Sequence, residues 1–292
     1  MSGRALPPPL LAIDAGNSRV KFGLFRPGSS LEGPSVWPEC CEFLAIPIDD
    51  PLPRDTLRRW TNDGASGVVI AGSNPPVVQR LLEEWDLGTT APLAIRDCSS
   101  IPVSTDVDFP ERVGLDRLLN AVAVNAIRPA DRAAIVIDSG TATTVDYVSA
   151  DGTFCGGAIL PGMELSARAL HQYTALLPLL PVLELGQEPI APGRNTRDAI
   201  RNGLFWGQVG AIRELIRQLC LRRGHRVPDF DSANPESTKP DSANAALDTP
   251  WLVLTGGGGP VLAPQFPSAR QLASLGMHGL VMTAWRKAAS EG

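Results

Sequence analysis

A strand–turn–strand pattern occurs twice in this 292-residue chain, at an offset of 124 residues. In the first copy, the run Leu11–Asp14 leads through a glycine-containing turn into the apolar run Val20–Phe25. In the second copy, Ile135–Asp138 leads through a similar turn into Thr144–Val148. Two copies about half a chain apart predict two similar domains that each open with the same β-hairpin. The alternative is a pair of unrelated hairpins, since Asp-x-Gly turns are common for purely local reasons.

The rest of the pattern predicts an α/β protein of two domains. Short apolar runs bounded by Gly, Asp or Asn indicate strands, and they alternate with segments of helical periodicity. The longest helical segment is Thr196–Leu221. The chain length suits two domains, which we expect at residues 1–128 and 129–292. The polar, aperiodic stretch 226–249 is expected to be a flexible surface insertion.

The composition argues against several classes of protein. A formal net charge of −5 argues against a nucleic-acid-binding surface, and five cysteines without a CxxC spacing argue against a zinc site. The absence of a cysteine framework suits a reducing compartment. Pro7–Pro9 interrupt any signal-peptide core, and no apolar run reaches the roughly 18 residues of a membrane span. We therefore expect a soluble cytoplasmic protein that binds neither nucleic acid nor membranes.

The two glycine turns are suited to binding phosphate. Glycine lets successive backbone N–H groups approach an anion closely, and Lys21 adds a positive charge nearby. Asp14 and Asp138 would repel a phosphate unless a cation lies between them, as Mg²⁺ commonly does in phosphoryl transfer. A further glycine run at 256–259 follows a predicted strand and could pack flat against a nucleoside. Neither the P-loop pattern nor the dinucleotide-binding glycine pattern occurs.

Six motifs in order resemble those of the type III pantothenate kinases. They are residues 14–25 (DAGNSRVKFGLF), 110–117 (PERVGLDR), 138–146 (DSGTATTVD), 156–162 together with 174–178, 195–196 leading into Gly203, and 255–257. Each motif alone is a weak signal, but six in the family's order are highly specific. The resemblance covers roughly residues 10–285, with 226–249 as an insertion.

The resemblance implies a fold, an activity and a set of ligands. The family belongs to the actin-like and sugar-kinase ATPase superfamily, whose members have two ribonuclease-H-like domains and a nucleotide cleft between them. The implied reaction is ATP-dependent phosphorylation of pantothenate to 4′-phosphopantothenate, the first step of coenzyme A biosynthesis. The implied cofactors are Mg²⁺ or another divalent cation with ATP, and K⁺ or NH₄⁺ as an activator. A homodimer with its substrate site near the subunit interface is also implied.

Asp116 matches the family's catalytic base, which accepts the proton of the pantothenate hydroxyl. It also stands at the predicted start of a helix, where the helix dipole favours an acid. Its neighbours Gly114, Leu115 and Arg117 favour the catalytic role, and they match contacts to the substrate. Thr196 matches a further substrate contact, although it could instead cap the helix that follows it.

The resemblance implies nucleotide contacts from both hairpins. Asp14 matches a residue that binds the ATP-bound divalent cation through water. The phosphate contacts match Ala15, Gly16, Asn17, Ser18, Arg19 and Lys21. Thr141 matches an ATP contact, and Asp138 matches a ligand of the monovalent cation. The local alternatives are a solvated strand residue for Lys21 and a turn-forming residue for Asp138.

Two other functions stay open. Val107 stands where many relatives have a tyrosine that lines the pantothenate pocket, and Phe109 lies close by in the sequence. A kinase of another small hydroxylated acceptor is therefore one alternative. The other is a non-catalytic, nucleotide-binding regulatory relative. Asp14, Lys21 and Asp116 are all present, which argues against a loss of catalysis.

Overall fold

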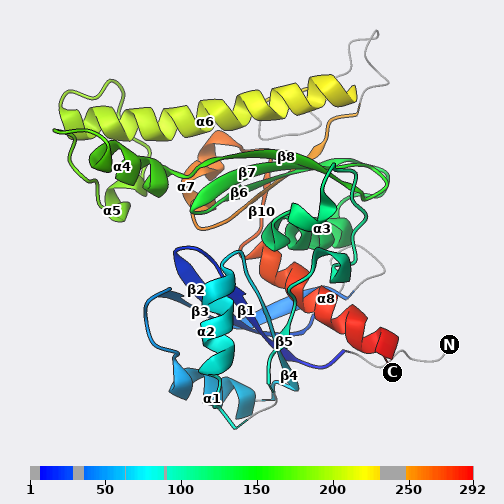
Figure 1. Ribbon diagram of the computed structural model, residues 1–292. Coiled ribbons are helices and arrows are strands. Elements are labelled where there is room, and N and C mark those ends of the chain that lie inside the picture. The colour runs from blue at the N-terminus through cyan, green and yellow to red at the C-terminus, as the bar shows by residue number, and fades with distance from the viewer. Residues whose placement is uncertain (1–6, 29–35, 63, 89–90, 231–247, 292) are drawn as a thin grey trace. The chain divides into compact units, whose positions relative to one another are not determined.

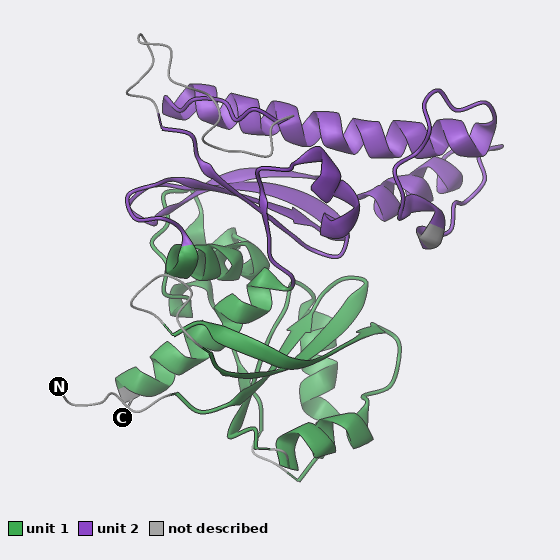
Figure 2. Ribbon diagram, turned by 180° about the vertical axis from the view of Figure 1, so that it is seen from behind, with its two compact units in different colours: residues 1–127, 274–292 green, residues 128–273 purple. Residues whose placement is uncertain are grey.

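The computed structural model describes residues 7–28, 36–62, 64–88, 91–230 and 248–291. The chain forms two compact units (Figure 2): unit 1 contains residues 1–127 and 274–292, and unit 2 contains residues 128–273. This division differs from the expected one at the C-terminus, because the last helix belongs to unit 1. Of the expected insertion 226–249, residues 231–247 lie outside the described residues.

Unit 1 is built on a mixed sheet of five strands (Figure 1). The strands are β1 (Leu10–Ala15), β2 (Arg19–Pro27), β3 (Pro38–Pro47), β4 (Gly67–Ala71) and β5 (Leu93–Ala94). They lie in the order β3-β2-β1-β4-β5. Strand β2 is antiparallel to both β1 and β3, whereas β4 runs parallel to β1 and β5 runs parallel to β4.

The helices of unit 1 pack their apolar sides against this sheet and against one another. They are α1 (Arg54–Asn62), α2 (Pro75–Glu83), α3 (Leu115–Ile127) and α8 (Leu275–Glu291), with single 3-10 turns η1 (Cys98–Ser100) and η2 (Pro110–Arg112). Leu57 of α1 and Leu81 of α2 lie in one buried cluster with Ile13, Phe22 and Ile70 of the sheet. Helix α8 packs along α3.

Unit 2 repeats this sheet. Its strands are β6 (Ala134–Ser139), β7 (Ala142–Val148), β8 (Phe154–Pro161), β9 (Trp251–Thr255) and β10 (Arg270–Gln271). Its helices are α4 (Met163–Gln172), α5 (Val182–Leu185), α6 (Thr196–Arg223) and α7 (Gly259–Leu262), with the 3-10 turn η3 (Ala263–Gln265). The strand order is β8-β7-β6-β9-β10, with two antiparallel pairings followed by two parallel ones.

The two sheets therefore share one strand order and one set of strand directions. In each unit, the repeated sequence pattern forms the central antiparallel hairpin, β1-β2 in unit 1 and β6-β7 in unit 2. The prediction of two similar α/β domains with a ribonuclease-H-like sheet is confirmed. The alternative of two unrelated hairpins is wrong, because the likeness extends to all five strands of each sheet.

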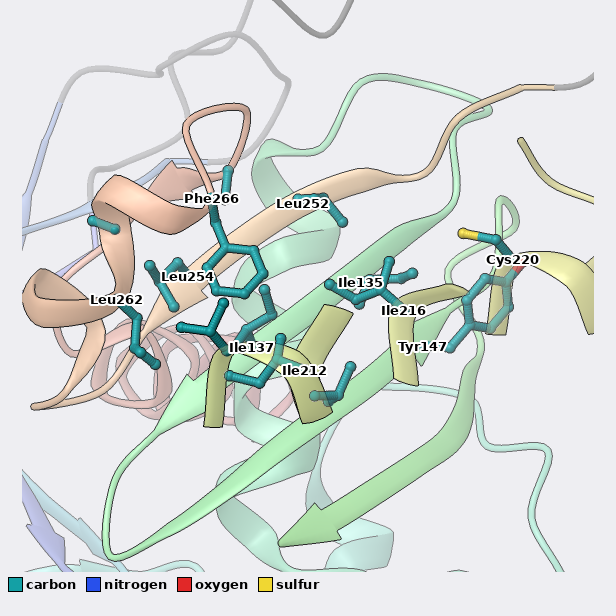
Figure 3. Close-up of a cluster of buried hydrophobic side chains, with 14 of the residues drawn as sticks. Ile135, Ile137, Tyr147, Ile212, Ile216, Cys220, Leu252, Leu254, Leu262 and Phe266 are labelled. Atoms are coloured by element: carbon teal, nitrogen blue, oxygen red, sulfur yellow. The ribbon is translucent and has the colours of Figure 1, made fainter. Parts of the chain in front are cut away.

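The core of unit 2 lies between its sheet and α6 (Figure 3). Ile135 and Ile137 of β6 and Tyr147 of β7 belong to one buried cluster with Ile212 and Ile216 of α6. Alternate residues of a strand point to the same face of a sheet, so the apolar positions of β6 and β7 meet α6 together. Burial of these branched side chains is the main force that holds α6 on the sheet.

The sequence of α6 contains clear start and stop signals. The side chain of Asn195 accepts a hydrogen bond from the N–H of Asp198 at 2.9 Å, and Gly224 ends the helix with a left-handed φ of 72°. The predicted helix from Thr196 to Leu221 is confirmed, with an end two residues later. The cap is Asn195, so the interpretation of Thr196 as the cap is wrong. No helix in the described ranges is both long and apolar enough to cross a membrane.

His278 anchors α8 to the sheet of unit 1. Its Nδ1–H donates to the carbonyl oxygen of Pro38 at 3.0 Å. Its ring stacks on Trp37 at a centroid distance of 4.5 Å and meets the ring of Phe25 edge-on at 5.1 Å. Burial lowers the pKa of His278 to about 4, against the opposing effect of the hydrogen bond to Pro38. The buried position of His278 therefore favours the neutral imidazole.

We expect the protein to lose stability as the pH falls from about 6.5 to about 4 because of His278. The unfolded chain binds a proton at its ordinary pKa of 6.5, whereas the folded protein binds one only near pH 4. The stabilisation is thus complete above pH 6.5 and falls by up to roughly 3 kcal/mol as the pH approaches 4. Urea unfolding at both pH values measures the loss. His278→Phe keeps an aromatic ring but removes the titrating group, so this variant should lose less stability as the pH falls. An equal loss in the variant would contradict this prediction.

Candidate active site

The hairpin of unit 1 places an acidic and a basic side chain side by side. Asp14 of β1 and Lys21 of β2 are direct cross-strand partners. Lys21 Nζ donates to Asp14 Oδ2 at 2.8 Å, and the two side chains are 35% and 25% exposed, respectively. The turn beside them is closed by a hydrogen bond of 3.0 Å from the N–H of Gly16 to the carbonyl of Arg19. An anion at this turn would meet backbone N–H groups and one ammonium group.

The loop between β4 and α2 borders the same turn. Asn17 Nδ2 donates to Ser73 Oγ at 3.3 Å, and the N–H of Asn74 donates to the carbonyl of Ala15 at 3.2 Å. Gly72 lies so close that an added Cβ would stand 2.2 Å from the carbonyl oxygen of Ala15. Sequence reasoning assigned no role to this loop. The sequence feature that could have identified this loop is Gly72 directly after a strand, followed by the helix-capping residue Asn74.

Asp116 lies in the first turn of α3 and is partly buried. Its Oδ1 accepts the N–H of Arg117 at 2.9 Å, and an added Cβ on Gly114 would lie 2.5 Å from that oxygen. Burial above all raises the pKa of Asp116, and the charge of Asp14 raises it further. The Arg117 N–H, the Arg117 charge and Lys21 act in the opposite direction. Asp116 is thus a stronger base than an ordinary aspartate and shares an electrostatic environment with the Asp14–Lys21 pair.

In unit 2, Asp138 lies against the glycine run that follows β9. Gly256 has a φ of 86°, and an added Cβ there would lie 2.5 Å from Asp138 Oδ1 and 2.4 Å from the carbonyl oxygen of Ser139. The N–H of Gly258 donates to that same carbonyl at 2.8 Å. Thr141 lies in the adjoining turn between β6 and β7. The fold thus brings the glycine run and the second hairpin into contact, and only glycine fits at position 256.

Thr196 lines an apolar groove of unit 2. The groove has a volume of about 720 Å³ and lies between α4 and α6. Leu165 and Tyr173 line it on one side, and Ile200 and Leu204 line it on the other. Thr196 is the first residue of α6 and is exposed. Its hydroxyl is one of several in the lining of this mainly apolar groove, with those of Ser166 and Thr174.

A family model described as type III pantothenate kinase matches residues 10–218. This chain belongs to the type III pantothenate kinase family. The type III pantothenate kinase of Gluconobacter oxydans is 36% identical over 77% of this chain and 79% of its own. That of Paramagnetospirillum magneticum is 37% identical over 72% of this chain and 80% of its own.

A solved structure agrees with this assignment at the level of the fold. A crystal structure from Campylobacter jejuni, described as a Baf family transcriptional activator, aligns with 97% of this chain and 100% of its own. The TM-score is 0.53 and the identity is 18%. This likeness shows the shared fold and carries no information about the reaction.

Membership of the type III pantothenate kinase family confirms the expected enzyme class. The chain is a kinase that uses ATP with a divalent cation and acts on a small molecule, pantothenate, in coenzyme A biosynthesis. The family assignment favours this reading over the non-catalytic regulatory alternative.

The acidic residues of unit 1 suit a divalent cation that arrives with ATP. No group of three His, Cys, Asp or Glu side chains that could hold a metal ion gathers among the residues that the structure describes. Mg²⁺ in nucleotide sites is bound mainly by phosphate oxygens and water, with one or two carboxylates. The partly exposed carboxylate of Asp14 fits this requirement.

Proposed function

We propose that this pantothenate kinase uses Asp116 as the general base toward the 4′-hydroxyl of pantothenate. The supporting observation is the raised pKa of Asp116, which arises from burial and from the charge of Asp14. A base is most effective when its pKa lies close to the working pH. A partly buried aspartate under the charge of a second carboxylate is better matched to proton transfer than an exposed one.

In the proposed step, the hydroxyl oxygen attacks the γ-phosphorus of ATP while the bond to the ADP oxygen breaks. The hydroxyl proton passes to the carboxylate of Asp116, and the products are 4′-phosphopantothenate and ADP. Catalysis of this kind depends on alignment of the two substrates and on compensation of the phosphoryl charge. Lys21 supplies a positive charge at the transferring group, because its Nζ lies beside the hairpin turn of unit 1.

The hairpin turn of unit 1 is the proposed phosphate site. Its contacts are the backbone and side chains of Ala15, Gly16, Asn17, Ser18 and Arg19, together with Lys21. Asp14 would hold the divalent cation through water, and the bound cation neutralises phosphate charge. Support comes from the tight turn, which the hydrogen bond from the Gly16 N–H to the Arg19 carbonyl closes, and from the ammonium group of Lys21 beside it.

Four further residues are proposed to bind pantothenate: Gly114, Leu115, Arg117 and Thr196. The first three adjoin Asp116, so a substrate whose hydroxyl meets the base would also meet them. Val107 is half-buried, and Phe109 is 57% exposed with the Arg112 guanidinium 4.9 Å from its ring centre. Val107 and Phe109 are the reason to assay other small hydroxylated acceptors in addition to pantothenate.

Asp138 is proposed to bind the activating monovalent cation, K⁺ or NH₄⁺, and Thr141 to contact ATP. The carboxylate of Asp138 lies beside the carbonyl oxygen of Ser139 at the turn of Gly256. Carboxylate and carbonyl oxygens together are suitable ligands for a hard cation.

We expect Asp138→Ala to abolish most of the stimulation by K⁺ and to leave the turnover without K⁺ nearly unchanged. The reason is that the variant loses the one charged ligand of the proposed site. Turnover measured against KCl, with NaCl at equal ionic strength, tests this. Asp151→Ala alters an exposed acidic turn of the same unit and should keep the full response. A full K⁺ response in Asp138→Ala would remove the proposed role.

A homodimer is proposed, with the apolar surface of unit 2 in its interface. Three large apolar side chains of unit 2 are mostly exposed: Tyr173, which lines the groove, at 80%, Leu176 at 91% and Ile190 at 89%. Association of two chains would cover exposed apolar side chains of this kind. Sedimentation equilibrium should give twice the 31.0 kDa mass of the chain. A monomer at micromolar concentration would contradict the proposal.

The assay that tests the whole proposal is steady-state release of ADP from ATP and Mg²⁺, with and without pantothenate and K⁺. Turnover that depends on pantothenate and rises with K⁺ supports it. ATP binding without pantothenate-dependent turnover would favour another acceptor. We propose that the reaction takes place in the cytoplasm, where ATP is abundant, and localisation of a tagged chain tests this point.

A further inference from the structure

The C-terminal helix α8 touches α3 backbone to backbone. Gly279 of α8 faces Leu119 of α3, and a Cβ added to Gly279 would lie 1.9 Å from the Leu119 carbonyl oxygen. Cβ atoms essentially never come within 3.0 Å of a heavy atom to which they are not linked through the adjoining chain. Any side chain at position 279 must therefore push the two helices apart.

This contact lies beside the turn of α3 that carries Asp116. Leu119 follows Asp116 by three residues, which is close to one helical turn, so both lie on neighbouring positions of one helix face. A second glycine, Gly276, faces the same stretch of α3. A Cβ there would lie 3.4 Å from Asn120 Oδ1 and 3.9 Å from the carbonyl oxygen of Asp116. Gly276 and Gly279 of α8 therefore both face the first turns of α3.

The other side of α8 contacts the sheet that carries the Asp14–Lys21 pair. A Cβ added to Gly23 of β2 would lie 3.1 Å from Met277 Cε, and Met277 is 1% exposed. The next residue, His278, donates to the carbonyl of Pro38, and Trp285 Nε1 donates to the carbonyl of Pro8 at 2.8 Å. Helix α8 therefore lies in direct contact with the sheet and with α3 (Figure 1).

We infer that α8 sets the distance from Asp116 to Asp14 and Lys21, and that Gly279 is a positioning residue for Asp116. This inference rests on the proposed role of Asp116 as the base. The charged groups around Asp116 are Asp14, Lys21 and Arg117, and the separation of α3 from α8 controls how closely the first two approach it. The close contact at Gly279 keeps the base near the phosphate site and shields it from water.

Gly279→Ala is the direct test. A misplacement of about 1 Å at a catalytic group can cost roughly 10²-fold in rate, so we expect kcat to fall at least about ten-fold. Wider spacing also admits water and moves Asp116 away from Asp14. Both changes lower the pKa of Asp116, so the acid limb of the kcat–pH profile should move to lower pH. The KM for ATP should change little. Simple loss of folded protein would lower kcat without moving the acid limb.

Gly210→Ala is the matched control. Gly210 lies in the exposed face of α6, and a Cβ there meets nothing within 4 Å. Alanine favours a helix over glycine, so this variant should keep both kcat and the acid limb of the wild type. Circular dichroism and thermal unfolding check that each variant is folded.

Gly276→Leu keeps the inference testable if Gly279→Ala does not fold. The Cβ of this variant has ordinary contact distances, and only its outer atoms press on Asn120. We expect a smaller fall in kcat with a shift of the acid limb in the same direction. An unmoved limb and a wild-type kcat in either folded variant would overturn the inference. Full turnover in Asp116→Asn would instead overturn the proposed base, so the two failures are distinguishable.

Discussion

Asp116→Asn is expected to lower kcat by roughly 10²–10⁴-fold while ATP binding stays nearly intact. The amide has the shape of the carboxylate, so its oxygen can still accept the Arg117 N–H and fits the space that Gly114 leaves. It cannot accept the hydroxyl proton of the substrate. Steady-state kinetics together with calorimetric titration of a nonhydrolysable ATP analogue separate the loss of turnover from any loss of binding.

The pH dependence gives a second measure of Asp116. Activity requires the unprotonated base, so kcat falls as the pH drops through the pKa of this group. Because burial and Asp14 raise that pKa, the acid limb of the wild type should lie at a higher pH than an ordinary aspartate would give. Asp55→Asn changes a fully exposed acid of the same unit and should leave the profile unchanged. Near-wild-type turnover in Asp116→Asn would show that another group accepts the proton.

Lys21→Met is expected to lower kcat by about 10²–10³-fold, the usual cost of removing one group that stabilises transition-state charge. Methionine retains much of the aliphatic stem, so the packing of β2 should survive. The lost ammonium leaves the phosphoryl oxygens and Asp14 uncompensated, which should also raise the KM for ATP. Kinetics at several Mg²⁺ concentrations measure both effects.

Two variants sharpen the test of Lys21. Lys21→Arg keeps the charge but changes its shape and reach, so it should recover part of the loss. Lys287→Met removes another of the three lysines in the chain, in the last turns of α8, and should behave as the wild type. If Lys21→Met turns over normally, the lysine is a solvated strand residue and the phosphate charge is compensated elsewhere.

Several features could be predicted from the sequence because short-range physics determines them. The short apolar runs that end at Asp14 and Asp138, each followed by a glycine turn and a returning run, predict the two hairpins. Asn195 and Gly224 delimit α6 through capping contacts within a few residues. The repeat of the hairpin predicts two similar domains, which the shared strand order of the two sheets confirms.

The role of Asp116 needed more than local pattern. An acid at the start of a helix is favoured by the helix dipole alone, so only the family motif around it indicated catalysis. The structure adds a physical reason to assign Asp116 as the base. Asp14 lies about one hundred residues earlier in the chain, yet its charge acts on Asp116 within unit 1. The loop of Gly72, Ser73 and Asn74 joins the same site without any sequence signal that specified its partner.

The sequence by itself determined the two hairpins, the long helix α6 and the family. Only the tertiary structure decided that the last helix, α8, packs in the first unit and meets α3 at Gly279. The periodicity of α8 indicates that it has an apolar face but not which surface that face covers. That choice depends on which backbones can approach closely, and the close approach at Gly279 becomes visible only when both helices are in place. Local pattern specifies elements, whereas the fit between distant surfaces specifies their partners.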